Sequence, residues 1–248
     1  MVSSIGVYTL NSVSAKRGEV QFFSQFAFTP QGDRIHVRAR SRSQQLLAFP
    51  SLAPVPHLEP PLNDDSPKIP FETDGDFKIA QSEVKLRGGA ILRPGPTQRR
   101  NSSDWGIDMF DGEGTFVRCF DQGRVVGFDV SPDQKRLACY GHQSNGQGRE
   151  FPLIIWDLAT GDEVSRINVY PRPDYHLRYS PDGKWLATRH ADGVVRVWDV
   201  QTRQPVFALE AEHFTVEQFV FSKDGRYLVG GHPASSIKVV WDLRDEKK

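Results

Sequence analysis

The sequence predicts an all-β fold that is assembled from repeated four-stranded antiparallel sheets. Two features recur along the chain with their mutual spacing kept. An apolar run that ends in Trp-Asp occurs three times, at intervals of 42 and 43 residues, at Trp156, Trp198 and Trp241. A turn of the form Ser-Xaa-Asp precedes each run, beginning at Ser131, Ser180 and Ser222. Self-similarity at such a period is typical of an architecture in which each copy is one small structural unit.

The clearest copy runs from Tyr175 to Leu209. Pro181 fixes φ for a turn and Gly183 accepts the left-handed conformation, so the chain returns antiparallel. The dipeptide Asp192-Gly193 favours a second tight hairpin turn. The apolar runs around these turns predict four strands, at residues 176–180, 185–188, 194–200 and 205–209. A four-stranded meander of this size cannot bury both of its faces, so it needs neighbours of its own kind.

A period in the low forties, with four strands and a Trp-Asp pair in each period, resembles the WD-repeat β-propeller family. Three copies match closely and cover residues 125–243. The resemblance implies an all-β β-propeller of about five four-stranded antiparallel blades in one domain, with a ring that is either closed or incomplete. Rings of this family commonly have seven blades, so the expected number is unusual.

The blade boundaries follow from where these strands and turns recur. Residues 7–13 resemble a lone strand, and WD-repeat proteins often complete the last blade with an N-terminal strand, so we expect it to pair beside residues 237–243. Alternatively, it is the tail of an earlier blade. The proline-rich residues 51–76 cannot form a ladder strand and predict an extended insertion, or else a ligand for a proline-recognising domain. The predicted parts are a closing strand at 1–19, a first blade at 20–50, the insertion at 51–76, a degenerate second blade at 77–120, and blades at 124–168, 174–209 and 213–243.

Bulk composition narrows the classes of partner. The chain has 31 basic and 31 acidic residues among 248, so no whole-molecule field favours nucleic acid or an anionic membrane. Its two cysteines, Cys119 and Cys139, lie in predicted strands and are interpreted as small core residues. The N-terminus has no basic segment followed by a long apolar one, which predicts a cytoplasmic location.

Six residues are candidates for partner binding. Three histidines, His142, His190 and His232, follow the second strand of three blades and are expected on similar rims of the ring. Converging imidazoles suit zinc or copper, whereas the alternative is a turn residue inherited with the repeat. Three arginines alternate with small or apolar residues along the second strand of the first blade and give it a basic face: Arg38, Arg40 and Arg42. This face either binds an anionic partner or is solvated and paired with acidic neighbours.

The family resemblance also implies a structural network in each blade. It joins an Asp of the second hairpin turn, a Ser or Thr of the second strand, a His before the first strand, and the Trp. Asp192, Thr188 and Trp198 fit this pattern, but no His lies near Tyr170. In the last blade His213 and Trp241 fit, while Ser235 replaces the Asp. We therefore expect these residues, with Trp156, to be structural and the blades to depend mainly on packing.

No catalytic motif is present, and no cofactor is expected. The favoured hypothesis is a non-enzymatic scaffold that binds a protein or peptide through blade-edge loops and the channel mouth. The long loop at residues 141–152 is the preferred recognition loop, because binding concentrates on loops of rigid scaffolds. One alternative is the C-terminal regulatory or sensor part of a larger chain, in which an open ring would be completed by missing residues or by a second copy in an oligomer. Another is a propeller enzyme or a metal or cofactor binder.

Overall fold

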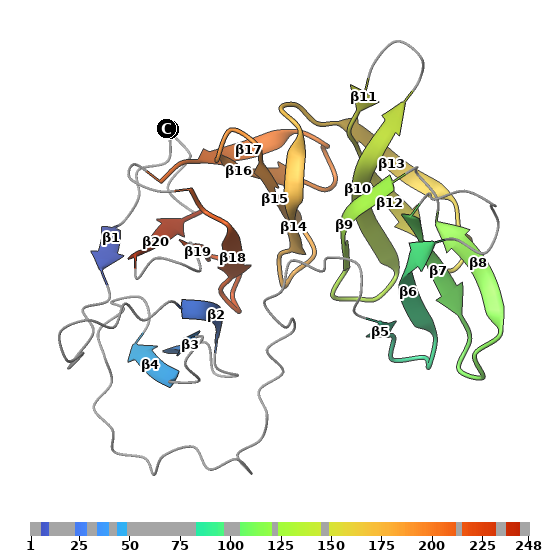
Figure 1. Ribbon diagram of the computed structural model, residues 1–248, viewed down its shortest axis with the longest axis horizontal. Coiled ribbons are helices and arrows are strands. Elements are labelled where there is room, and N and C mark those ends of the chain that lie inside the picture. The colour runs from blue at the N-terminus through green and yellow to red at the C-terminus, as the bar shows by residue number, and fades with distance from the viewer. Residues whose placement is uncertain are drawn as a thin grey trace. The chain divides into compact units, whose positions relative to one another are not determined.

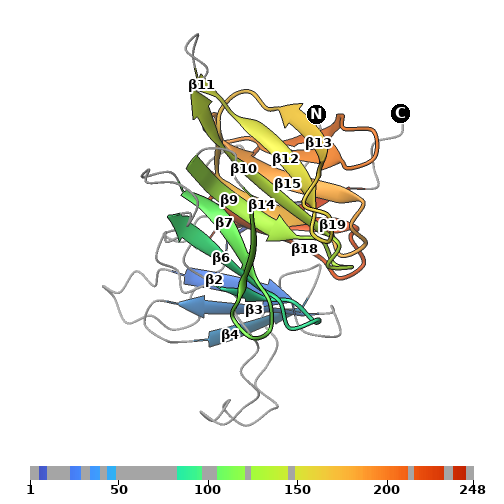
Figure 2. The ribbon, with the colours of Figure 1, turned by 90° about the vertical axis from the view of Figure 1, so that its right-hand side faces the viewer.

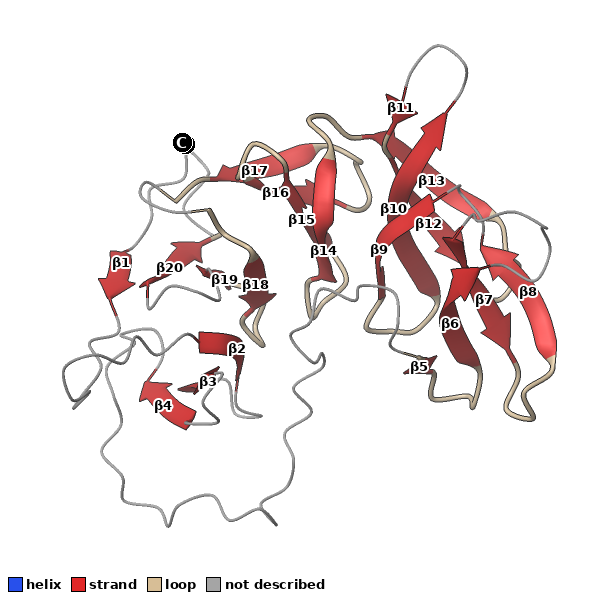
Figure 3. Ribbon diagram, viewed as in Figure 1, coloured by secondary structure: helices blue, strands red, loops and turns tan. Residues whose placement is uncertain are grey.

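Strands and turns account for all the regular structure that the computed structural model describes (Figure 3). The described residues are 6–9, 23–28, 34–39, 44–48, 83–96, 105–120, 124–144, 149–211, 215–231 and 237–243. By their internal contacts they fall into two compact units, residues 1–76 with 211–248, and residues 77–210. Each unit is described by itself below.

The first unit contains two antiparallel sheets (Figure 1). One has the strand order β2 (Phe23–Phe28), β3 (Arg34–Ala39) and β4 (Gln44–Ala48). The other has the order β1 (Gly6–Thr9), β20 (Ile237–Asp242), β19 (Tyr227–Gly231) and β18 (Gln218–Phe221). β1 lies antiparallel to β20, with Val7 opposite Val239, which is the pairing that the sequence predicted. The N-terminal strand therefore completes a sheet whose other three strands come from the far end of the chain.

The second unit contains three antiparallel sheets, which correspond to the predicted second, third and fourth blades. The first is β5 (Val84–Lys85), β6 (Ile91–Pro96), β7 (Trp105–Phe110) and β8 (Phe116–Phe120). The second is β9 (Arg124–Val130), β10 (Arg136–Ser144), β12 (Pro152–Asp157) and β13 (Glu163–Asn168), with the short β11 (Arg149–Glu150) added to the end of β10. The third is β14 (Pro173–Tyr179), β15 (Trp185–His190), β16 (Val195–Asp199) and β17 (Pro205–Leu209). The all-β fold of four-stranded antiparallel blades is confirmed.

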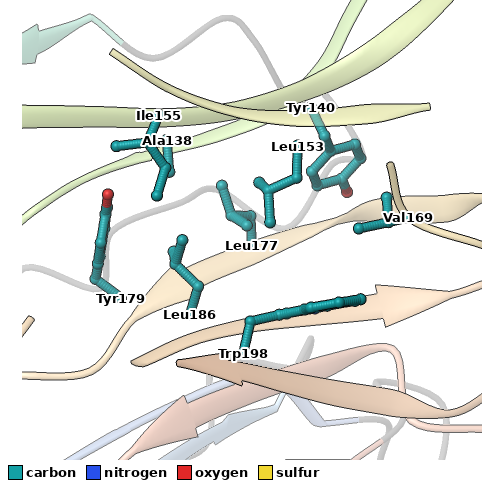
Figure 4. Close-up of a cluster of buried hydrophobic side chains, with 9 residues drawn as sticks. All are labelled: Ala138, Tyr140, Leu153, Ile155, Val169, Leu177, Tyr179, Leu186 and Trp198. Atoms are coloured by element: carbon teal, nitrogen blue, oxygen red, sulfur yellow. The ribbon is translucent and has the colours of Figure 1, made fainter. Parts of the chain in front are cut away.

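Side chains of β10 show how neighbouring blades bury each other's faces. Leu137 and Cys139 lie in a buried cluster with Leu92, Ile107 and Phe120 of the preceding blade. The alternate residues of β10 lie in a second cluster with the following blade (Figure 4), which comprises Ala138, Tyr140, Leu153, Ile155, Val169, Leu177, Tyr179, Leu186 and Trp198. The period-two alternation of a strand thus supplies both faces of the third blade. β9 and β14 also lie side by side across this seam (Figure 2).

The Ser-Xaa-Asp turns take the conformation that the sequence predicts. In each, the serine hydroxyl donates to the aspartate two residues later at 2.6 Å and accepts the N–H of the residue that begins the next strand. The fourth position has a positive φ, +71° at Gly183 and +70° at Gly225. In the third blade Gln134 takes this position with φ 59°, and its side chain accepts the Arg87 N–H of the preceding blade at 2.7 Å.

Two predictions about local structure are wrong. The Pro-, Gly- and Ser-rich composition of residues 92–104 predicts a loop, yet residues 92–96 belong to β6 and pair with β7. Within the described residues β5 pairs only with Ile91 and Leu92 of β6. Pro94 and Pro96 lie beyond this pairing, where the edge of β6 is open in the part of the chain that the structure describes and no N–H is needed for a ladder hydrogen bond. Residues 141–152 were also expected to be a loop, but β10 continues to Ser144 and returns as β11.

Candidate functional site

The connection between the third and fourth blades presents an exposed aromatic residue. This connection, residues 169–172, is called the Tyr170 loop. Its Tyr170 is 84% exposed, and the other large apolar side chain exposed among the described residues is Val117, at 42%. Large apolar side chains are normally buried, so a tyrosine left in solvent is informative about function.

The backbone of the Tyr170 loop is fixed on both sides of the tyrosine. Before it, the buried Val169 donates its N–H to the carbonyl of Phe151 at 3.3 Å. After it, the Pro171 carbonyl accepts a hydrogen bond from the ring of His190 at 2.7 Å, and the Arg172 carbonyl accepts the Ala191 N–H at 2.9 Å. The loop is therefore tied to the third blade at one end and to the fourth blade at the other.

The bond to Pro171 is the end of a chain of hydrogen bonds that begins inside the fourth blade. Trp198 donates its indole N–H to the Thr188 hydroxyl at 2.8 Å, and Thr188 Oγ1 lies 2.9 Å from His190 Nε2. Thr188 and His190 are both fully buried. This set of contacts, from Trp198 through Thr188 and His190 to Pro171, is called the Trp198 relay.

The directions of these hydrogen bonds follow from the chemistry of the groups. A carbonyl only accepts, so His190 Nδ1 carries the proton that is donated to Pro171. In a neutral ring Nε2 is then an acceptor, and the Thr188 hydroxyl donates to it. Burial is the main cause that lowers the pKa of His190 below its ordinary value of 6.5, which favours this neutral form.

A hairpin of the third blade stands beside the Tyr170 loop. Gln143 pairs with Glu150 and Ser144 with Arg149, so β10 and β11 extend beyond the ends of the other strands of their sheet (Figure 1). The chain leaves this hairpin at Phe151, whose carbonyl accepts the Val169 N–H. Residues 143–144 and 149–150 of the loop predicted as a recognition element are thus paired strands, and the chain that leaves them is hydrogen-bonded to the Tyr170 loop at Phe151.

Comparison with known proteins matches residues 175–199 to the family described as "WD domain, G-beta repeat". The chain is 30% identical over 163 residues to WD repeat-containing protein SL1-17 of Schistosoma mansoni, covering 62% of this chain and 53% of that protein. It is 29% identical over 101 residues to Transcription factor unc-37 of Caenorhabditis elegans, covering 41% of this chain and 16% of that protein. It is also 29% identical over 99 residues to WD repeat and SOCS box-containing protein 1 of Mus musculus, covering 38% and 23%. Over these residues the chain is similar to proteins of the WD-repeat family.

Similarity to the WD-repeat family carries a general expectation of function. Proteins of this family typically bind protein partners and are generally scaffolds without enzymatic activity. This chain spans about half the length, or less, of the relatives named above. The particular partner and any activity of the whole protein are therefore matters for proposal.

The WD-repeat network forms in the fourth blade with two changes, one at the histidine and one at the aspartate. Thr188 and Trp198 are joined as expected, but the histidine comes from the end of β15, not from a position before the first strand. Asp192 lies outside the relay, accepting the Val194 N–H at 3.1 Å and pairing with Arg196 at 2.7 Å. The hydrogen bond from Arg196 is the largest cause that lowers the pKa of Asp192.

The other two WD-repeat tryptophans have different partners at the position of Thr188. In each blade this position lies two residues after the one opposite the Trp, which gives Cys139 for Trp156 and Gly230 for Trp241. Trp241 is fully buried against Gly230, where an added Cβ would lie 2.7 Å from the indole ring. Among the described residues, no hydrogen-bond partner is present for its indole N–H. Within that part of the chain, the complete relay is a property of the fourth blade.

The structure separates the histidines that the sequence grouped. His190 is in the interior of its blade and not on a rim, because it shares the face of Thr188 and Leu186 that packs on the third blade. His142 is not equivalent to His190, because it lies five residues after the one opposite Trp156, whereas His190 lies four residues after the one opposite Trp198. The side chain of His142 and all of His232 are outside the described residues. Both ring nitrogens of His190 have partners, so it is not available to a metal.

The arginine candidates lie in or next to β3. Arg38 pairs with Gln44 in the ladder of β3 and β4, and its side chain is outside the described residues. β3 ends at Ala39, before Arg40 and Arg42, which also lie outside them. Among the residues that the structure does describe, no three His, Cys, Asp or Glu side chains gather as metal ligands would. The same part of the chain has no helix of the length and apolarity that a membrane crossing requires.

Tyr170 was not singled out from the sequence. The available sign was a tyrosine in the segment Val169-Tyr170-Pro171-Arg172, between two predicted strands. Such a position is compatible with any loop residue, because exposure depends on the packing of both neighbouring blades. His190 was singled out, but for the rim and not for the interior.

Proposed function

We propose that this chain is a non-enzymatic interaction scaffold that binds a protein or peptide partner with the Tyr170 loop and the adjoining β10–β11 hairpin. The observation that carries the proposal is the 84% exposure of Tyr170 on a loop whose backbone is hydrogen-bonded immediately before and after it. Tyrosine is enriched among the residues that contribute most to binding, because it buries a large area and also forms hydrogen bonds.

The anchored backbone is what makes this tyrosine suited to binding. Association costs free energy for every side chain and loop that must be ordered. The Tyr170 loop is already held by Phe151, His190 and Ala191, so a partner meets a surface whose backbone is in place. Arg172 of the same loop and Glu150 of β11 are exposed and carry charges of opposite sign. An aromatic residue on a surface that also offers charged groups fits a protein or peptide partner.

The test compares Tyr170→Ala with Val117→Ala in affinity capture from cell extract, followed by titration of a recovered, purified partner. Val117 is the matched control, because it is also exposed but lies on β8, in another blade. We expect Tyr170→Ala to weaken binding by about 2 kcal/mol, or roughly thirtyfold in Kd, as for a residue at the centre of an interface. Val117→Ala should bind like the unaltered protein. Equal affinity of the two variants would refute this site.

Several sequence-based expectations stay predictions beside this proposal. They are the absence of a nucleic-acid or membrane partner, the cytoplasmic location, and the regulatory or sensor role within a larger chain. The blade boundaries, the arginine face and the state of the ring are also untested. The metal or enzyme alternative is not favoured, because His190, one of its three candidate ligands, is fully engaged in the Trp198 relay.

A further inference from the structure

The Trp198 relay ends on the residue that follows Tyr170. We propose that His190 is a positioning residue, which sets the geometry of the partner-binding loop by transmitting the fixed position of Trp198 to the Pro171 carbonyl. This inference rests on the proposed function of Tyr170, but its structural part is testable without any partner.

The relay starts at a buried, closely packed residue. Trp198 packs in the buried cluster between the third and fourth blades, with Leu186 beside it on the same face (Figure 4). Its indole N–H has a single direction, so the position of the Thr188 oxygen follows from it at 2.8 Å. The His190 ring lies 6.3 Å from the Trp198 ring, centroid to centroid, at an interplanar angle of 35°. The imidazole is thereby held from one side by an aromatic ring and from its edge by a hydroxyl.

With a neutral His190 ring, the relay admits one arrangement of protons. Nδ1–H points to Pro171, the unprotonated Nε2 receives the Thr188 O–H, and the Thr188 oxygen receives the Trp198 N–H. The remaining acceptor near the Thr188 hydroxyl is the Arg196 carbonyl at 3.4 Å, which is more distant than Nε2 at 2.9 Å. Each hydrogen bond therefore fixes the direction of the next, as buried polar networks do when every member is satisfied.

A second proton on the His190 ring would break this arrangement. On Nε2 it would meet the Thr188 hydroxyl hydrogen, so the hydroxyl would have to turn to the longer contact with Arg196. Two charges act on the ring: Arg196 opposes an imidazolium and Asp192 favours it, and these two form an ion pair with each other at 2.7 Å. Burial has the largest effect on the pKa of His190 and lowers it, so the ring is neutral around pH 7. Acid is accordingly expected to disturb the relay and, through it, the loop.

The sign of the pH effect follows from the direction of the shift. The pKa of His190 is lower in the folded protein than its ordinary value of 6.5, so the unfolded chain binds the proton more tightly. The neutral ring therefore contributes fully to the free energy of unfolding above pH 6.5. This contribution is lost as the pH falls through the lowered pKa of the folded state.

The decisive measurement is nitrogen-15 NMR of the His190 ring in the unaltered protein. We expect the neutral form with the proton on Nδ1. A proton on Nε2, or fast exchange between the two forms, would overturn the relay. This measurement needs no variant and is independent of whether Tyr170 binds a partner.

The second measurement is hydrogen exchange of the Ala191 amide, which donates to Arg172 next to the relay. We expect His190→Phe to lower its protection by about fivefold to tenfold, the effect of one lost hydrogen bond. The matched control is Ser180→Ala, which removes hydrogen bonds at the opposite end of the same blade. It should leave Ala191 protected when both variants are compared at equal global stability. An equal loss in both variants would show that His190 has no special effect on the loop.

In the unaltered protein, the protection factor of the Ala191 amide should also fall as the pH is lowered through the His190 transition. In His190→Phe it should not change over that range, and a change of the same size there would contradict the proposal. If the tautomer and exchange results hold but Tyr170→Ala retains every partner, the relay stands and the proposed function fails. If Tyr170→Ala loses the partner but the proton is found on Nε2 of His190, the proposed function stands and the relay fails.

Discussion

Replacement of Thr188 by valine tests the energetic value of the Trp198 relay. Valine has nearly the same shape, and Thr188 is fully buried, so packing is conserved while the hydroxyl is lost. The indole N–H of Trp198 and Nε2 of His190 then lose their partners in the interior. A buried polar atom left unpaired costs about 1–3 kcal/mol, so we expect Thr188→Val to lower the free energy of unfolding by roughly 2–4 kcal/mol.

Thr188→Ser is the matched control, since it keeps the hydroxyl and removes one methyl group. Its expected cost is about 1 kcal/mol, from lost apolar burial and a small cavity. Urea unfolding measures both variants, and with a slope of about 2–3 kcal/mol per molar urea the valine variant should shift the midpoint by on the order of 1 M. If the valine variant were as stable as the serine variant, the hydrogen bonds of the relay would carry no net stability. The reasoning from buried partners would then be wrong.

A double-mutant cycle sharpens the same test. If Thr188 and His190 act in one chain, the second substitution should cost less after the first has broken the chain. The expected coupling between Thr188→Val and His190→Phe is therefore about 1 kcal/mol or more, as for residues that share a hydrogen bond. Strictly additive losses would indicate two independent contacts.

Three further predictions concern the blades themselves. Gly183→Ala should cost about 1–2 kcal/mol, because alanine is strained at φ +71°, whereas Gly88→Ala, at an open position without positive φ, should be nearly neutral in thermal unfolding. Gly230→Ala should cost about 1–3 kcal/mol by overpacking, since its Cβ would lie 2.7 Å from the Trp241 ring; an unchanged melting temperature would contradict this. Removal of residues 1–12 should expose the edge of β20 and cause self-association, detectable by light scattering, and a stable monomer would argue against a role for β1 in closing that edge.

The parts of the fold that the sequence predicted correctly are those set by local chemistry. Turns built on Ser-Xaa-Asp and on Asp-Gly specify their conformation within a few residues, so the strands around Ser180 and Gly193 lie close to where they were expected. The pairing of β1 with β20 was also predictable, because residues 7–13 resemble a lone strand and WD-repeat proteins often complete the last blade with an N-terminal strand.

The parts that were missed depend on contacts between distant segments. The strand with Pro94 and Pro96 forms because β5 leaves its edge open, which is not visible in the proline-rich sequence itself. His190 was placed on a rim because it follows the second strand of its blade, as His142 and His232 do in theirs, but the register of β15 assigns it to the face that packs on the third blade. A shift of one residue would have reversed this, so the position of the residue could not be predicted without the pairing.

The distribution of polar contacts among the tryptophans bears on where binding takes place. At the position of Thr188, Trp156 has Cys139 and Trp241 has Gly230. Neither residue has a hydroxyl that could continue a chain of hydrogen bonds to a loop. Trp198 meets Thr188, and the chain of hydrogen bonds from it reaches the surface beside the tyrosine that is 84% exposed. An exposed aromatic residue contributes most to affinity when its loop is ordered before the partner arrives. In the fourth blade, the histidine of the network comes from the end of β15, and the same blade combines an anchored loop with an exposed tyrosine. A role in stability alone would not require the relay to end beside that tyrosine.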